Sequence, residues 1–329
     1  MLNFERLRGS AATFLAAAGL LAGTGAVAQT ITLAEADTIT GENLVQLVAI
    51  ERAKARGVEA ELVSLRSDDI VFQAVLNGQV EIGVGTAYAP LQTLDDAPVR
   101  NFYQLRMSAY FPVVDKTQIS SWDDLDGAPI TVHARGSGTE AIARFIESVQ
   151  GIEFSELSYV PGSEVRAVAL RQGTINATFL DITNTRLVME EQPDKFGLLP
   201  LGEATASDSL LFARTDFLEE NAEAVQILVE ELMEVAAEFN ADPTLPAKLR
   251  EEMGLLPDLP QEMVDEITPY FLTATEADLF PENGGSMEAA RADIEFLTLS
   301  GALEGDPAEL DPLDFWTFDV IDAAKASME

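Results

Sequence analysis

Short β-rich runs alternate with amphipathic helical runs along most of the chain. Residues 31–35 read as a strand, 43–56 as a helix with one apolar side, and 58–65 as a second strand. A helix over 68–76 and a strand over 80–84 follow, and this strand is apolar enough to be buried on both faces. Such alternation predicts an α/β fold in which a mainly parallel sheet is flanked by helices.

The same pattern recurs in the middle of the chain. The segments 68–90 and 163–185 align when Gly78 is placed on Gly173, and each reads as cap, helix, glycine stop, strand and polar loop. The two copies are too far apart for a solenoid repeat, so they predict two similar α/β lobes. The final loops of the copies should lie at the carboxyl ends of equivalent strands, where open α/β sheets bind ligands.

Two extended runs should carry the chain between the lobes. The first covers 102–114 and is broken by Pro112, and the second covers 207–218. We therefore expect lobe 1 to be discontinuous (29–112 and 207–329), lobe 2 to be inserted (113–206), and the two crossings to form a hinge. Beyond the second crossing the pattern predicts a helical C-terminal region, with helices over 222–239, 243–253, 261–272 and 287–303.

The N-terminal segment has the layout of a secretory signal peptide. Two arginines precede an apolar run over 11–21, and Ala26 and Ala28 offer a cleavage site of small residues. The apolar run is too short to cross a bilayer. We expect residues 1–28 to be removed, and the mature protein to be located in the periplasm without direct membrane insertion.

Charge and cysteine content exclude several kinds of partner. The chain has 56 acidic and 20 basic residues, a net charge of -36, and no cysteine. Such a field repels phosphate backbones and anionic lipid, which argues against nucleic acid and membrane surfaces as partners. Disulfides and thiolate metal sites are excluded as well. We expect a monomer that needs no metal and no cofactor.

Four further segments carry a family resemblance. They are FQAVLNGQVEIGVG in the first lobe, SSWDDLDGAPITVHARGSGTEA and VALRQGTINATFLD in the second, and LLFARTDFLEEN at the return to the first. With the N-terminal segment, they resemble the solute-binding proteins of ABC importers, specifically the nitrate/sulfonate/taurine-type branch with the type II periplasmic-binding fold. The resemblance implies a two-lobed clamp that closes on a small solute and delivers it to an inner-membrane ABC permease. The lack of cysteine argues against a thiamine-precursor ligand, and the single histidine against nitrate.

One turn between a strand and a helix is suited to an anionic group. A helix start offers unpaired backbone N–H groups and a partial positive charge, and the serine and threonine of this turn add hydroxyl donors. Its glycines permit close approach of a ligand, and its arginine offers a forked pair of donors. Ordinary capping by the serine and a solvent-facing arginine are the alternatives. The residues concerned are Arg135, Gly136, Ser137, Gly138 and Thr139.

Polar residues at other loop ends supply different chemistry. Acids there could receive an ammonium or hydroxyl group of a ligand, and tyrosines could line the cleft, although helix capping and core packing are the alternatives. The combination suits a small organic anion or zwitterion, such as an aminosulfonate or an amino acid-like compound. These candidates are Asp37 and Thr38, Thr86 and Tyr88, Tyr110, and Asp181, Thr183 and Asn184.

The sequence contains little that resembles a catalytic motif. The only histidine, His133, has no nearby nucleophile motif, and the turn that follows it does not match a Gly-x-Ser-x-Gly elbow. We therefore expect a transport receptor without catalytic residues. A receptor of a TRAP-type carrier or of a sensor stays open, as does an exported enzyme on the same fold.

Overall fold

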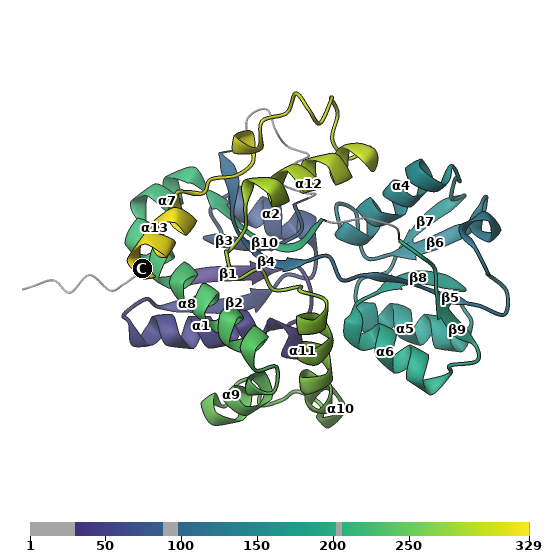
Figure 1. The fold of residues 1–329 in the computed structure, drawn as a ribbon, viewed down its shortest axis with the longest axis horizontal. Coiled ribbons are helices and arrows are strands. Elements are labelled where there is room, and N and C mark those ends of the chain that lie inside the picture. The colour runs from purple at the N-terminus through teal and green to yellow at the C-terminus, as the bar shows by residue number, and fades with distance from the viewer. Residues whose placement is uncertain (1–29, 88–97, 202–205, 329) are drawn as a thin grey trace, which may run out of the picture.

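The computed structural model describes residues 30–87, 98–201 and 206–328. The expected signal peptide (1–28) and Tyr88 lie outside these residues. The described chain forms two five-stranded sheets flanked by helices, and the sheets lie side by side as two lobes (Figure 1).

The first sheet has the strand order β2-β1-β3-β10-β4. β1 pairs in parallel with both β2 and β3, whereas β10 is antiparallel to both of its neighbours. Four of its five strands therefore share one direction. The strands are β1 (Ile31–Glu35), β2 (Ala60–Ser64), β3 (Ile82–Gly85), β4 (Val99–Met107) and β10 (Ser207–Arg214).

The second sheet repeats this arrangement in the order β7-β6-β8-β5-β9. Here β5 is the strand that runs against its neighbours. In each lobe the reversed strand thus comes from a segment that joins the two lobes, and β8 takes the place of β3, as the internal repeat predicts. The mainly parallel sheets are confirmed. The strands are β5 (Phe111–Asp115), β6 (Pro129–Val132), β7 (Glu156–Tyr159), β8 (Ala177–Leu180) and β9 (Phe196–Leu198).

Helices cover both faces of the first sheet because successive side chains of β1 point to opposite sides. Leu33 packs in the cluster that includes Leu44 of α1 (Leu44–Ala55), while Ala34 packs with Phe72 of α2 (Asp68–Leu76). The second lobe carries α4 (Gly138–Gln150), α5 (Ser163–Gln172) and α6 (Ile182–Glu191).

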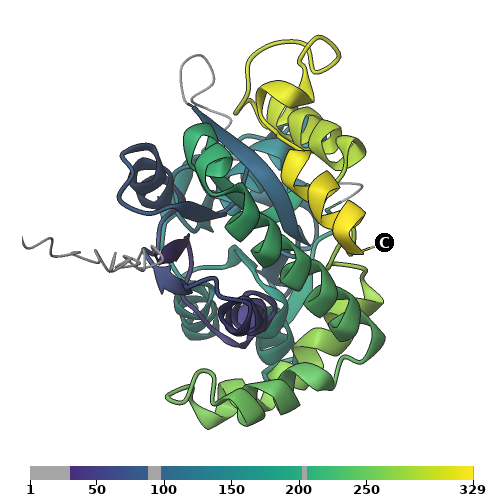
Figure 2. The same cartoon turned by 90° about the vertical axis from the view of Figure 1, so that its left-hand side faces the viewer.

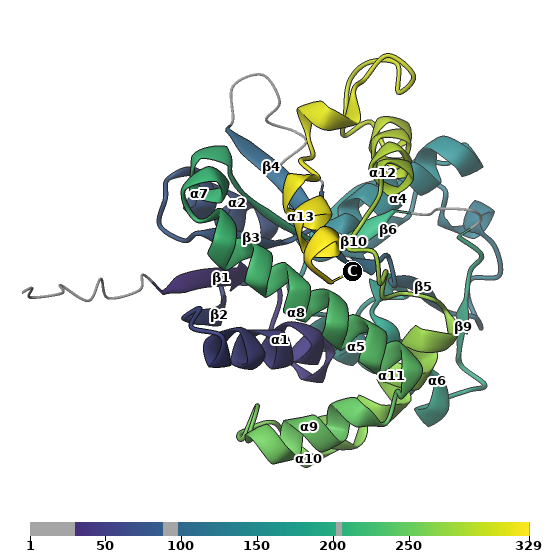
Figure 3. The ribbon, with the colours of Figure 1, turned by 60° about the vertical axis from the view of Figure 1, so that its left-hand side comes forward.

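The chain beyond β10 is helical, as expected. The longest helix, α8, runs diagonally across the first lobe and packs on α1 and α13 (Figures 2 and 3). None of the helices in the described ranges is long and apolar enough to cross a membrane. The helices are α7 (Thr215–Glu220), α8 (Ala222–Ala241), α9 (Leu245–Met253), α10 (Gln261–Asp265), α11 (Ile267–Glu276), α12 (Met287–Leu299) and α13 (Asp319–Met328).

A close contact seats the returning strand β10 against β3. A Cβ atom added at Gly83 would lie 2.2 Å from the ring of Phe212, a separation that real side chains do not adopt. The phenylalanine ring therefore lies directly on the backbone of β3, which only glycine permits.

Three boundaries differ from the sequence-based expectation. The first crossing is broken at residues 108–110 and not at Pro112, which lies within β5 and pairs with Phe179 of β8. The second crossing leaves the strand at Arg214, where α7 begins. The helix expected over 261–272 is two helices that meet at Glu266. Proline at position 269 explains that break, since it lacks the N–H that would bond to the carbonyl of Asp265.

Candidate functional site

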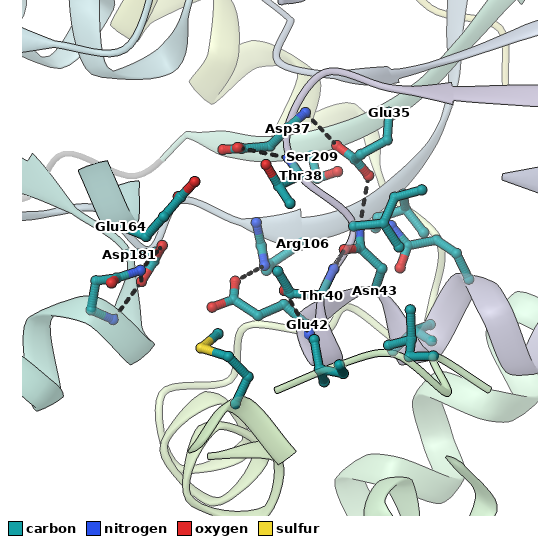
Figure 4. Close-up of a pocket in the computed structure, with 18 of the residues that line it drawn as sticks. Glu35, Asp37, Thr38, Thr40, Glu42, Asn43, Arg106, Glu164, Asp181 and Ser209 are labelled. Carbon is teal, nitrogen blue, oxygen red and sulfur yellow. Dashed lines mark hydrogen bonds and ion pairs between the residues drawn. The ribbon is translucent and has the colours of Figure 1, made fainter. Parts of the chain in front are cut away.

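A cavity of about 540 Å³ lies between the two lobes. The loop after β1 forms one side of it, and residues of α5 and α6 form the opposite side (Figure 4). Its floor includes β4 and β10. Among the residues expected from the sequence, Asp37, Thr38, Tyr110, Asp181 and Asn184 line this cavity.

Arg106 of β4 is the basic side chain at the centre of the cavity. A β-bulge positions its partner, because the register shifts between Ser207 opposite Met107 and Ser209 opposite Arg106, leaving Asp208 unpaired in the ladder. The Arg106 Nε and Nη2 atoms donate to Asp208 Oδ2 at 2.9 and 2.5 Å. Sequence reasoning missed this pair, since nothing local marks a bulge.

Two further donors of Arg106 are used as well, which makes four of its five N–H groups. Its Nη1 atom donates to Glu42 Oε2 at 3.0 Å and to the Tyr270 hydroxyl at 2.8 Å. Burial opposes the charge of Arg106, but the surrounding hydroxyls and carboxylates keep its pKa well above the ordinary value. The guanidinium is therefore charged and held by partners within the protein.

The loop after β1 is organised by hydrogen bonds among its own polar groups. Thr40 and Asn43 form a capping box, and Asn43 Nδ2 donates to Glu35 Oε2 at 2.9 Å. One carboxylate oxygen of Asp37 accepts the Thr38 backbone N–H at 2.8 Å. These bonds hold the Asp37 side chain at the cavity wall, where Figure 4 shows it.

Second-lobe residues approach from the start of α6. Asp181 caps this helix by accepting the Asn184 backbone N–H at 2.7 Å, and Asn184 Nδ2 donates to both of its carboxylate oxygens. Thr183 donates its hydroxyl hydrogen to Glu42 Oε1 at 2.9 Å, which joins the two lobes. Asp181 therefore caps α6 and also lines the cavity.

The helix start at 136–139 lies beside a smaller cavity of about 40 Å³ that shares Asp37, Arg106 and Tyr110 with the large one. Its lining includes Ser137, Gly138 and Thr139. This space holds only a few water-sized groups. The expected candidate Thr86 also lines it, and its backbone N–H and hydroxyl both donate to Asp68 Oδ1.

Three donors of that helix start already have acceptors in the protein, namely the backbone N–H groups of Gly136 and Ser137 and the Ser137 hydroxyl. The Gly136 N–H donates to Glu140 Oε2, and the Ser137 hydroxyl donates to the Ala134 carbonyl at 2.7 Å. Thr139 Oγ1 accepts the His133 backbone N–H at 2.8 Å. The serine thus acts as the capping residue named as the alternative, accepting the Glu140 N–H.

Arg135 and His133 take part in other contacts. The Arg135 guanidinium carbon lies 5.0 Å from the centre of the Tyr159 ring, and Arg135 is not among the residues that line either cavity. His133 Nδ1 accepts the Gly162 N–H at 3.2 Å. Burial and the neighbouring Arg166 lower the pKa of His133 to about 4, so its imidazole is neutral at physiological pH.

The carboxyl groups around the cavity are hard to ionise together. Burial and the negative charge of Asp37 raise the pKa of Glu35 to about 8, and burial and Asp181 raise the pKa of Glu42 to about 8 despite Arg106. The pKa of Asp208 is raised for the same main reason, burial. Because these carboxyl groups repel one another when ionised, the cavity favours binding of a positively charged ligand.

An apolar wall faces these acids, and sequence reasoning missed it. The α9–α10 connection contributes Leu256, Pro257 and Leu259, and Met263 of α10 and Phe280 complete the wall. Leu256 has a positive φ of 50°, and its carbonyl accepts a bond from Arg250 Nη2 at 2.9 Å. The sequence offered no signal for this wall, because the segment lies far from the strand ends along the chain.

The described ranges contain no cluster of side chains that would form a metal site. No group of three or more histidine, aspartate or glutamate side chains there is placed to hold a metal ion.

Comparison with known proteins places this fold. The family model described as "NMT1/THI5 like" matches residues 48–244. Among solved structures, a Bordetella bronchiseptica RB50 protein has 18% identity and a TM-score of 0.72, covering 91% of this chain and 98% of its own. No curated protein matches the sequence.

Two other similar structures have named ligands. The alkanesulfonate-binding protein SsuA of Xanthomonas axonopodis pv. citri, bound to MOPS, has 14% identity and a TM-score of 0.62, covering 84% of this chain and 94% of its own. The nitrate-binding protein NrtA of Synechocystis PCC 6803 has 13% identity and a TM-score of 0.66, covering 91% and 89%. At these identities the likeness establishes the periplasmic-binding-protein fold.

Proposed function

Because the chain belongs to the NMT1/THI5-like family, we propose that it is the periplasmic solute-binding receptor of an ABC importer. It captures a small organic solute between its lobes and delivers it to an inner-membrane permease. The observation that carries this proposal is the cavity of about 540 Å³, walled by both lobes at the ends of their sheets. This is the position at which open α/β sheets bind ligands.

The site supports binding without turnover. The single histidine is buried and neutral, and its Nδ1 atom is already an acceptor for Gly162. The Ser137 hydroxyl donates to the Ala134 carbonyl, so it is oriented as a helix cap. Neither group is arranged as a nucleophile paired with a base.

The lining of the cavity favours a zwitterion over a simple anion, the two solute classes expected from the sequence. Asp37, Glu42 and Asp181 meet there, and Arg106 already has acceptors in the protein. A simple anion such as a sulfonate would be repelled by this lining, whereas an amino group would find acceptors. The proposed solute therefore bears a positively charged amino group, as the zwitterion expected from the sequence does.

The experiment is to identify a solute that copurifies with the protein. The full chain is expressed with its export segment, purified from the periplasm, and denatured, and the released small molecules are identified by mass spectrometry. The protein is then freed of solute by unfolding and refolding, and the identified compound is added back. We expect the compound to bind and to reduce the radius of gyration measured by X-ray scattering, because the lobes close.

Two results would contradict the receptor function. One is the absence of any small molecule that binds between the lobes, and the other is conversion of the bound compound into a product by the purified protein.

A further inference from the structure

We propose that the solute is an organic cation with an apolar body and no acidic group, held by Asp37 and Asp181 from opposite lobes. This inference rests on the proposed receptor function, and it specifies the chemistry of the same cavity.

Asp37 and Asp181 both have acceptor capacity left for a ligand. A carboxylate has about four lone-pair sites. Asp37 uses one oxygen for the Thr38 N–H, and the Asp181 carboxylate accepts its hydrogen bonds from Asn184. Both residues line the large cavity, and Glu164 lies at its second-lobe side (Figure 4).

The two aspartates interact with each other across the cavity. Burial raises the pKa of Asp37, and the negative charge of Asp181 raises it further. The Thr38 N–H and the charges of Arg166 and Arg106 lower the same pKa. A cation placed between the two would relieve this repulsion and would join the lobes through charge-assisted hydrogen bonds.

An acidic group on the solute would lack a cationic partner. Among the described residues that line the large cavity, Arg106 is the one basic side chain. Four of its five N–H donors go to Asp208, Glu42 and the Tyr270 hydroxyl. An anionic group would have to displace these carboxylates from a buried guanidinium, which is costly.

The helix start does not offer an easy alternative for an anionic group. The small cavity in front of it is also lined by Asp37, Asp68 and Asp208. An anion bound there would lie among four carboxyl groups, since Glu35 lines this cavity as well, with Arg106 as the one guanidinium. The charge distribution therefore favours a cation over a zwitterion.

The wall opposite the acids explains why the cation should be organic and amphiphilic. Leu256, Leu259, Met263 and Phe280 present apolar surface to the cavity. Apolar surface buried against this wall contributes to binding in proportion to its area. A hydrated metal ion or a bare ammonium ion would leave the wall unused.

The test uses three probes of the same shape and different charge: benzamidine, benzamide and benzoate. Their dissociation constants for the full mature protein are measured by calorimetry at neutral pH, after removal of any copurified compound. We expect benzamidine to bind at least about tenfold more tightly than benzamide, and benzoate more weakly than both. A parallel titration with Zn²⁺ should give weaker binding than benzamidine.

Matched variants place the cation at the proposed acids. Asp181→Asn keeps the capping ability of the side chain and removes its charge. It should weaken benzamidine binding about tenfold and leave benzamide binding unchanged. Glu191→Gln at the other end of the same helix changes the net charge equally, and its side chain is 52% exposed, so it should bind benzamidine like the parent protein.

Some outcomes overturn the inference and leave the receptor function standing. These are tighter binding of benzoate than of benzamidine, equal binding of all three probes, failure of benzamidine to bind, tighter binding of Zn²⁺, or a copurified solute with an acidic group. Equal effects of Asp181→Asn and Glu191→Gln would also overturn it. The receptor function itself fails only on the results given for it above.

Discussion

The Thr183 hydroxyl of α6 donates a hydrogen bond of 2.9 Å to the carboxylate of Glu42, which lies in the loop after β1 of the other lobe. A second link lies beside it, since Arg186 of α6 forms an ion pair with Glu266 at the start of α11. Both links join α6 to the first lobe next to the cavity. The start of α6 is therefore one second-lobe element that is bonded directly to the first lobe.

Replacing Thr183 by valine should favour the open arrangement of the lobes. The substitution removes the hydroxyl that bonds Glu42 and keeps the shape of the side chain. Solute affinity should fall by about 0.5–1.5 kcal/mol, and the radius of gyration of the solute-free protein should increase. Thr185→Val is the matched control, because that hydroxyl bonds the Leu180 carbonyl within the second lobe. A larger radius for both variants would argue against a specific role of the link.

Replacing Arg106 by methionine should destabilise the protein strongly. The Asp208 side chain is only 4% exposed, and it would lose its charged partner. Leaving one member of a buried pair uncompensated costs about 3–5 kcal/mol, which urea unfolding can measure. Arg214→Met is the control, because its partner Asp216 is 51% exposed and such surface pairs contribute about 0–1 kcal/mol. Similar losses in both variants would contradict the structural role of Arg106.

The stability of the solute-free protein should decrease as pH rises from about 5 to 8. Glu35 and Glu42 have pKa values raised to about 8 in the folded protein, whereas 4.5 is the ordinary value. Between these values the folded protein holds protons that the unfolded chain has released. Unfolding then releases protons, and the free energy of unfolding falls as pH increases. Melting temperature measured across this range checks the direction.

Glu42→Gln provides the control for this pH dependence. Glu42 faces Arg106, Asp37 and Asp181, so its neutral analogue should flatten the fall in melting temperature. Glu191→Gln should leave the slope as it is in the parent protein. A melting temperature that rises steadily from pH 5 to 8 would show that these carboxyl groups are ionised in the folded state. Benzamidine affinity, by contrast, should increase over the same range, since a deprotonated acid pairs with the cation.

Replacing Ser137 and Thr139 together by alanine should reduce stability without a solute present. The serine caps α4, and the threonine oxygen accepts the buried His133 N–H. Loss of a helix cap and of a buried acceptor should cost about 2–4 kcal/mol together. Thr174→Ala, which removes an exposed hydroxyl, should cost much less. An unchanged stability with weaker binding of taurine would instead support the anion site expected from the sequence.

The architecture could be predicted because it depends on patterns that are local in the chain. Period-two and helical patterns are set by which faces are buried, so β1 and α2 have the bounds expected for them. The aligned glycines, Gly78 and Gly173, each follow a helix and precede equivalent strands. Boundaries were less predictable near prolines, because Pro112 lies within a strand and Pro269 ends a helix one turn earlier in the chain.

The charge of the cavity could not be predicted, because it arises where distant segments meet. Asp37 and Asp181 were recognisable as candidates from their places at strand ends. Nothing in the local pattern indicated that Arg106 would be neutralised by Asp208, since that pairing requires a bulge between strands far apart in the chain. The order of helices and strands thus follows from the amino-acid pattern alone, while the burial and mutual repulsion of the acids follow from packing two lobes around one cavity.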